Sequence, residues 1–236
     1  MLGPMWAVPL LAAAVACVFA VLLGGQFLER RQPYQLAWSL ALVMFAVASL
    51  AVVLGVVNGW SRLEFQVYWA LGAVLNVPFL AAGEALLLLR RRTVVWAVAL
   101  VLVFVIAYTV AVLRGAPMSA AALAERLPSG KDVFGDGTAA HRLPQLISYP
   151  SYFILLAGAL WSAWRMRGRP ELKDRFVGTL LIALGATVVA GGATFAALGQ
   201  LPGFIVTLVA GIALMFWGFL RASRRSAPAT AAPASP

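Results

Sequence analysis

Residues 65–92 read FQVYWALGAVLNVPFLAAGEALLLLRRR, a stretch with one charged residue, Glu84, before it ends in three arginines. An α-helix rises about 1.5 Å per residue, so roughly 20 apolar residues cross a hydrocarbon core about 30 Å thick. Residues 65–89 are long enough for that crossing. We therefore interpret them as a membrane-spanning helix, with Arg90–Arg92 at the membrane surface.

Six further apolar stretches of comparable length share this pattern, and none of them contains a charged residue. The predicted spans cover residues 5–28, 34–57, 65–89, 93–113, 146–164, 176–198 and 203–220. Only 11% of the 236 residues are charged, against about 25% in soluble domains. The sequence therefore predicts an all-α polytopic membrane protein, a seven-transmembrane-helix bundle.

The predicted bundle accounts for residues 1–225 as one domain, because the spans use up most of the chain. Residues 226–236 contain only Ala, Pro, Ser and Thr. They have too little apolar bulk to pack, so we expect a disordered cytoplasmic tail.

The 18 basic residues are divided unevenly between the two sets of segments that connect the spans. One set holds Arg30, Arg31, Arg90, Arg91, Arg92, Arg165, Arg167, Arg169, Lys173, Arg175, Arg221, Arg224 and Arg225. The other set holds Arg62, Arg114, Arg126, Lys131 and Arg142. Lys and Arg gather in short cytoplasmic loops, so we predict that the amino terminus is outside and the carboxyl terminus cytoplasmic. Arg outnumbers Lys 16 to 2, a bias typical of GC-rich bacterial genomes, so we expect the bacterial cytoplasmic membrane.

The third predicted span carries the polar residues that bear most on function. Pro78 lies inside it, and proline removes an amide donor and clashes with the carbonyl four residues earlier, at Val74, so we expect a kink. Asn76 lies near the middle of the span, and Glu84 follows about two turns later. Ionisable groups in a span are costly to expose to lipid and often serve function. Asn76, Pro78 and Glu84 are therefore the candidate ligand or transport residues.

Two of these residues also have a structural interpretation. Asn76 suits a hydrogen bond between helices, the commoner use of a polar residue in a span. Glu84 lies only about 8 Å along the helix axis from Arg90. We therefore favour a structural anchor, in which Glu84 pairs with Arg30, Arg31 or the Arg90–Arg92 cluster, over a binding or transport site.

Glycines recur every seven residues in the last two spans. Gly178, Gly185 and Gly192 lie in the sixth, and Gly211 and Gly218 have the same spacing in the seventh. A seven-residue repeat keeps one face toward a neighbouring helix, and missing side chains let two backbones approach closely. We interpret the five as helix-packing residues, with a glycine-lined substrate groove as the alternative.

The longest connecting segment, 114–145, separates the fourth and fifth spans. Ser119 to Leu127 is expected to form a short helix capped by Ser119, and the Gly- and Asp-rich residues 129–141 to be irregular. Asp132, Asp136 and His141 carry metal-ligating atoms, but they match no complete calcium-loop pattern. We expect a solvated loop here and no metal site.

The spans lack the residues that most enzymes need, since none contains His, Lys, Arg or Asp. Hydrolysis in a membrane needs a nucleophile with a base, or a metal with its ligands. Seven helices with an outer amino terminus share their topology with rhodopsins, but residues 203–220 contain no lysine to bind retinal. We predict no enzymatic activity and no cofactor.

The sequence leaves two functional hypotheses open. The first is a non-catalytic binding, sensing or accessory bundle, which fits the sparse polar interior. The second is a small-solute transporter that uses a polar site at the kinked third helix. The expected partner is the lipid bilayer, with anionic lipid at the cytoplasmic Arg clusters. The net charge of +10 is explained by membrane orientation, so no nucleic acid partner is expected.

Overall fold

The computed structural model describes residues 7–89 and 91–222, and this part of the chain contains helices, turns and loops but no strand. Seven helical runs are long and apolar enough to cross a membrane. They cover Pro9–Arg30, Pro33–Asn58, Arg62–Leu88, Arg92–Gly115, Ala139–Met166, Lys173–Ala196 and Leu201–Ala222. Each overlaps one predicted span, so the helical class and the seven apolar helices are confirmed. The predicted tail at 226–236 lies outside the described residues.

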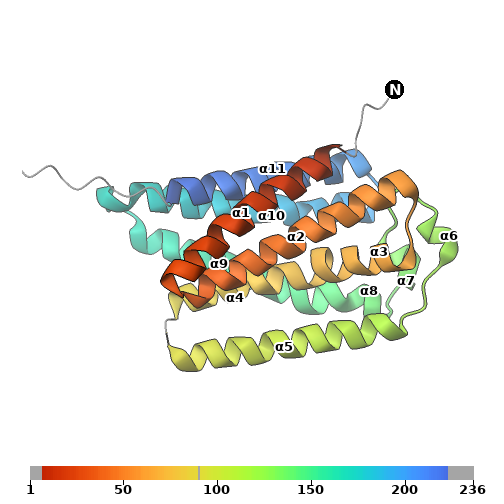
Figure 1. The fold of residues 1–236 in the computed structure, drawn as a ribbon, viewed down its shortest axis with the longest axis horizontal. Helices are drawn as coiled ribbons and strands as arrows, with labels where there is room; N and C mark the ends of the chain where they lie inside the picture. The colour runs from red at the N-terminus through yellow and green to blue at the C-terminus, as the bar shows by residue number, and fades with distance from the viewer. Residues whose placement is uncertain (1–6, 90, 223–236) are drawn as a thin grey trace, which may run out of the picture.

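Successive long helices run in opposite directions, so their ends gather at two opposite ends of the bundle (Figure 1). The long helices are α1 (Ala7–Arg30), α2 (Pro33–Asn58), α4 (Asn76–Leu88), α5 (Arg92–Gly115), α9 (Tyr149–Met166), α10 (Lys173–Ala197) and α11 (Leu201–Ala222). We name the end with the α1–α2 and α9–α10 turns the Arg-rich end. The opposite end, which carries the α5–α9 connection, is the loop end.

Two of the runs are composite. The third joins α3 (Arg62–Val67), the π-helix η1 (Tyr68–Leu75) and α4. The fifth joins α8 (Ala139–Leu143), a second π-helix, η2 (Pro144–Ser148), and α9. The fifth run therefore begins about two turns earlier than the predicted span, because α8 and η2 lead into α9 without a break.

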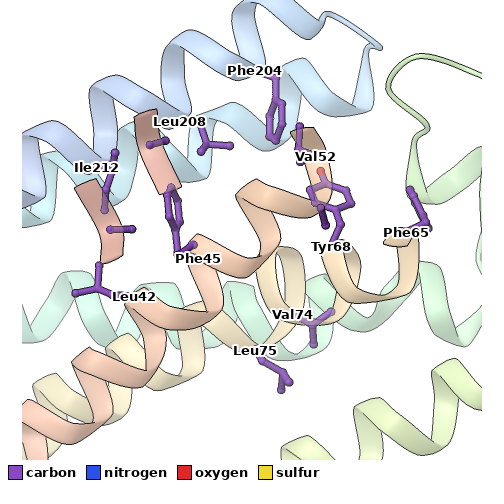
Figure 2. Packing of buried hydrophobic residues seen from close by; sticks show 14 of the residues in the cluster. Leu42, Phe45, Val52, Phe65, Tyr68, Val74, Leu75, Phe204, Leu208 and Ile212 are labelled. Atoms are coloured by element: carbon purple, nitrogen blue, oxygen red, sulfur yellow. The ribbon is translucent and has the colours of Figure 1, made fainter. Parts of the chain in front are cut away.

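The apolar core lies where α1, α2, η1 and α11 meet. Figure 2 shows Leu42, Phe45 and Val52 of α2 in one cluster with residues of α11. Tyr68 of η1 contacts the ring of Phe204 at a centroid distance of 6.3 Å. The contact between α10 and α11 is the most extensive of all the helix pairs.

Helix α5 lies at the edge of the bundle (Figure 1), and only Thr109 and Leu113 are buried on it. Large apolar side chains such as Leu100 and Phe104 are mostly exposed along it. In water this exposure would be unfavourable, but a bilayer covers such surfaces with lipid tails that are equally apolar. The apolar surface of α5 is therefore of the kind that suits contact with lipid tails.

The connection between α5 and α9 contains three short helices, where one short helix and an irregular segment were expected. They are α6 (Ala120–Leu123), α7 (Gly130–Phe134) and α8. Ser119 caps α6 as predicted, although that helix ends at Leu123 and not at Leu127. The prediction of irregular structure over 129–141 is wrong, because Ser129 and Thr138 accept amide hydrogen bonds as N-caps of α7 and α8.

Side-chain donors tie this connection to the end of the bundle. The indole of Trp60 donates to the Arg126 carbonyl at 3.2 Å, and that of Trp69 donates to the Ala140 carbonyl at 3.0 Å. Gly130 lies against the Trp69 ring, where a larger residue would overlap it. The connection is therefore packed onto the helices and covers the loop end.

Candidate functional site at the interrupted third helix

The third run changes its hydrogen-bond register before Pro78. Over Tyr68–Leu75 the backbone is a π-helix, and the Asn76 amide donates to the Leu71 carbonyl five residues earlier. The buried Pro78 has no amide hydrogen, so the Val74 carbonyl receives no donor from the position four residues later. From Pro78 we expected a kink, and the structure describes a wider, π-helical stretch immediately before it, which was not predicted. Such π-helical turns are frequent at functional sites.

Ser148, the last residue of η2, compensates for this lost donor. Its hydroxyl lies 2.9 Å from the Val74 carbonyl oxygen and 2.7 Å from the Ala73 carbonyl oxygen. One hydroxyl hydrogen is therefore shared between two adjacent carbonyls of the third run. Ser148 was not among the predicted site residues, because nothing in the sequence distinguishes it from Ser151, the next serine of the same helical run.

Asn76 connects the third run to α2. Its side-chain amide donates to the Ala41 carbonyl at 2.7 Å, and Asn76 is buried. A second bond runs in the opposite sense, from the Trp38 indole of α2 to the Leu80 carbonyl at 3.0 Å. Gly83 makes room for this indole, since any side chain there would overlap Trp38. Asn76 therefore acts here as an interhelical donor.

Glu84 faces α9 and is only 5% exposed. The Ser162 hydroxyl donates to its Oε1 atom at 3.1 Å. Gly158, one turn earlier on α9, accommodates the rest of the side chain, because a Cβ there would lie 2.5 Å from Glu84 Cγ. The acid thus occupies a fitted position between two helices.

The expected arginine partner of Glu84 is not found among the described residues. None of the ion pairs in residues 7–89 and 91–222 includes Glu84. Arg30, Arg31, Arg91 and Arg92 are exposed, and Arg90 lies outside the described residues. The expectation rested on distance along the helix axis, which says nothing about the direction in which a side chain points.

Gln35, near the start of α2, forms a second buried polar position. It is 1% exposed, and its amide donates to Gln26 Oε1 of α1 at 3.2 Å. Its own carbonyl oxygen has no hydrogen-bond partner within the described part of the chain. Next to it along α2, Ser39 donates to the Ala20 carbonyl at 2.9 Å. These bonds join α1 to α2 as Asn76 and Trp38 join α2 to α4.

The regularly spaced glycines lie at the contact between α10 and α11. A Cβ added at Gly178 would lie 2.5 Å from the Gly218 carbonyl oxygen, and one at Gly185 would lie 2.5 Å from the Gly211 carbonyl oxygen. Gly192 lies against Thr207, where the same addition would meet the hydroxyl at 2.6 Å. The absent side chains allow backbone-to-backbone packing, the arrangement expected where no hydrophobic effect drives association.

The loop residues with metal-ligating atoms are engaged in local contacts within the α7–α8 segment. Asp132 accepts a hydrogen bond from Ser129, Asp136 pairs with Lys131 at 3.4 Å, and His141 Nδ1 accepts from the Gly137 amide. His141 Nδ1 also lies 3.5 Å from Asp136. No group of three potential ligands suited to a metal ion occurs within the described ranges.

The arrangement defines an all-helical protein with seven helices that are long and apolar enough to cross a membrane. Its buried polar side chains lie mainly between helices, where they bond to backbone carbonyls or to one another. No protein-family model, curated protein or solved structure matches the chain.

Proposed function

We propose that this chain is a multi-pass protein of the bacterial cytoplasmic membrane, with its amino terminus outside and its carboxyl terminus in the cytoplasm. Seven apolar helices support the insertion. The orientation is supported by the basic residues, which are concentrated at the Arg-rich end. The loop end carries Arg62, Arg114, Arg126, Lys131 and Arg142 beside the acids Glu64, Glu125, Asp132 and Asp136.

We propose further that the bundle is non-catalytic and acts in binding, in sensing or as an accessory subunit. The observation that carries this proposal is that the polar groups of the third run are used between helices. Asn76 binds the Ala41 carbonyl, the freed Val74 carbonyl binds Ser148, and the Glu84 carboxyl binds Ser162. A polar group that is already bonded to a neighbouring helix is not available to a ligand unless that bond breaks.

A small-solute transporter is the second candidate, and one observation favours it. Glu84 is a buried ionisable group in α4, the helix that follows the π-helix and contains Pro78. Membrane transporters place ionisable groups beside interrupted helices, where the loosened backbone can rearrange. In that function Glu84 would carry a proton or hold a cationic solute.

Proton flux in reconstituted vesicles distinguishes the non-catalytic bundle from a transporter in which Glu84 carries a proton. The purified protein is placed in liposomes with an internal pH-sensitive dye, and the decay of an imposed proton gradient is compared with that of protein-free liposomes. Glu29→Gln is the matched control, since Glu29 is an exposed acid at the Arg-rich end. The non-catalytic proposal expects equal decay in all vesicles. Faster decay with the wild type and with Glu29→Gln, but not with Glu84→Gln, would establish proton transport instead.

A further inference from the structure

The turn between α9 and α10 contains a shallow pocket that no step of the proposed function uses. It has a volume of about 340 Å³ and lies at the Arg-rich end. Its lining consists of Met166, Arg167, Gly168, Arg169, Lys173 and Phe176. Three basic residues and two large apolar residues therefore line one concave surface, and most of the surface that they present there is apolar.

The backbone of this turn explains how the cations come together. Arg167 has φ −59° and ψ 135°, Gly168 has φ +78°, and the Arg169 amide donates to the Met166 carbonyl at 3.3 Å. These values describe a type II turn, in which the third residue needs the positive φ that glycine adopts freely. The turn reverses the chain within four residues, so Arg167 and Arg169 line the same pocket as Lys173, the first residue of α10.

Two acids, Glu171 and Asp174, lie in the same segment as the three basic residues of the pocket. The ion pair of this region joins Asp174 to Arg221 of α11, at 3.1 Å. None of the ion pairs in the described ranges includes Arg167, Arg169 or Lys173. The first turn of α10, which also carries Asp174, has the partial positive charge of a helix amino terminus. Three basic residues without an ion pair in those ranges, at one concave surface, favour an anionic ligand.

The residues around the pocket indicate which kind of molecule carries the anionic group. Trp161 and Trp164, on the last turns of α9, are 50% and 63% exposed. Exposed tryptophans at the end of a span favour the headgroup layer of a bilayer. Met166 and Phe176 line the pocket beside the cations, which suits a ligand whose anionic group continues into an apolar part.

We propose that the α9–α10 turn binds the phosphate group of an anionic phospholipid, with Arg167, Arg169 and Lys173 contacting the phosphate and Met166 and Phe176 contacting the adjoining glycerol and acyl chains. The inference rests on the proposed insertion in a membrane. It goes beyond general attraction of basic loops to lipid, because it assigns the binding to one pocket.

The test uses the full-length protein in detergent and three probes: dihexanoyl phosphatidylglycerol, dihexanoyl phosphatidylcholine and inorganic phosphate. Binding is followed by the change in melting temperature and by microscale thermophoresis. The variant Arg167→Gln/Lys173→Gln removes two cations from the pocket. The variant Arg91→Gln/Arg92→Gln removes two exposed cations from the α4–α5 turn at the same end, and it is the matched control.

We expect the wild type and the control to bind phosphatidylglycerol with similar affinity. The pocket variant should bind it roughly twentyfold more weakly, because each basic residue near an anionic headgroup contributes about a fivefold factor. Phosphatidylcholine should bind weakly to all three proteins, since its quaternary amine is repelled by the cations. Inorganic phosphate that competes at equal concentration would overturn the assignment to a lipid, because the pocket would then bind free phosphate.

Equal losses of phosphatidylglycerol binding in the two variants would overturn the proposal, because the attraction would then be diffuse. Equal binding of phosphatidylcholine and phosphatidylglycerol would overturn it too. Alkaline carbonate extraction of the same protein from cell membranes tests insertion separately. If the protein resists extraction but the two variants lose phosphatidylglycerol binding equally, the membrane insertion stands and the pocket is not a lipid site.

Discussion

The hydroxyl of Ser148 lies 2.9 Å from the carbonyl oxygen of Val74, the group that Pro78 leaves without its helical donor. The two residues are 74 positions apart in the chain. Pro78 can therefore be buried inside the bundle, because Ser148 of the fifth helical run supplies the hydrogen-bond donor that the Val74 carbonyl lacks. This bond also joins the third and fifth helical runs at a point where the third is widened into a π-helix.

Ser148→Ala should destabilise the protein by about 1 kcal/mol, because it removes the hydroxyl donor from the buried Val74 carbonyl and a hydrogen bond contributes on this scale. Ser151→Ala is the matched control, since Ser151 donates only to the Ile147 carbonyl of its own helical run. Both variants are compared with the wild type by denaturant titration in mixed micelles. Equal stability of the two variants would contradict the role given to Ser148.

A double-mutant cycle isolates the relationship with Pro78. In a Pro78→Ala background the residue 78 amide is restored, so the Val74 carbonyl regains a local donor. Ser148→Ala should then destabilise the protein less than it does in the wild type. The stability effects of substitutions in one hydrogen-bond network are not additive. Identical losses of stability in the two backgrounds would therefore show that Ser148 does not compensate for Pro78.

The sequence was sufficient to predict the seven helices because each depends on a local run of apolar residues. Interactions between distant residues carry no such local signal. The pattern around Glu84 indicated a buried acid but not that it faces Ser162, and the arginine pairing expected from axial distance was wrong for the described residues. Ser148 was missed for the same reason.

The short helices at the loop end were mispredicted for a different reason. Gly and Asp were read as helix breakers over residues 129–141, whereas Ser129 and Thr138 are N-caps and Asp132 lies in the first turn of α7. Tertiary contacts stabilise these short helices, since Gly130 packs on Trp69 and Phe134 is buried. Those contacts depend on the positions of other helices, which the local sequence pattern does not reveal.

Gly185→Leu should destabilise the protein strongly, by about 1–3 kcal/mol or more, the scale of overpacking in tight cores. The added side chain would meet the Gly211 carbonyl and Met215 of α11. Gly191→Leu on the same helix is the control, because nothing lies within 4 Å of a Cβ added there. The melting temperatures of the two variants in detergent provide the measurement. A larger loss for Gly191→Leu would mean that α10 packs through another face.

Glu84→Gln should leave the stability nearly unchanged, because the glutamine side-chain carbonyl can still accept the hydrogen bond from Ser162. Glu84→Ala removes the acceptor and leaves space beside Gly158, so it should cost roughly 1–3 kcal/mol, as buried substitutions commonly do. Thermal unfolding of both variants in detergent compares them. A strong loss of stability in Glu84→Gln would indicate a charged partner, as in the arginine-anchored interpretation, and would contradict the contact with Ser162 alone.

The orientation is tested by labelling single cysteines in intact cells with a membrane-impermeant thiol reagent. The native Cys17 lies within the first span, so Cys17→Ala supplies a cysteine-free background. Lys131→Cys is placed at an exposed position of the loop end, and Glu29→Cys at an exposed position of the Arg-rich end. Because short cytoplasmic loops retain basic residues, Lys131→Cys should react in intact cells and Glu29→Cys only after the membrane is permeabilised. The reverse pattern would invert the whole bundle, and it would also move the α9–α10 pocket to the outer leaflet.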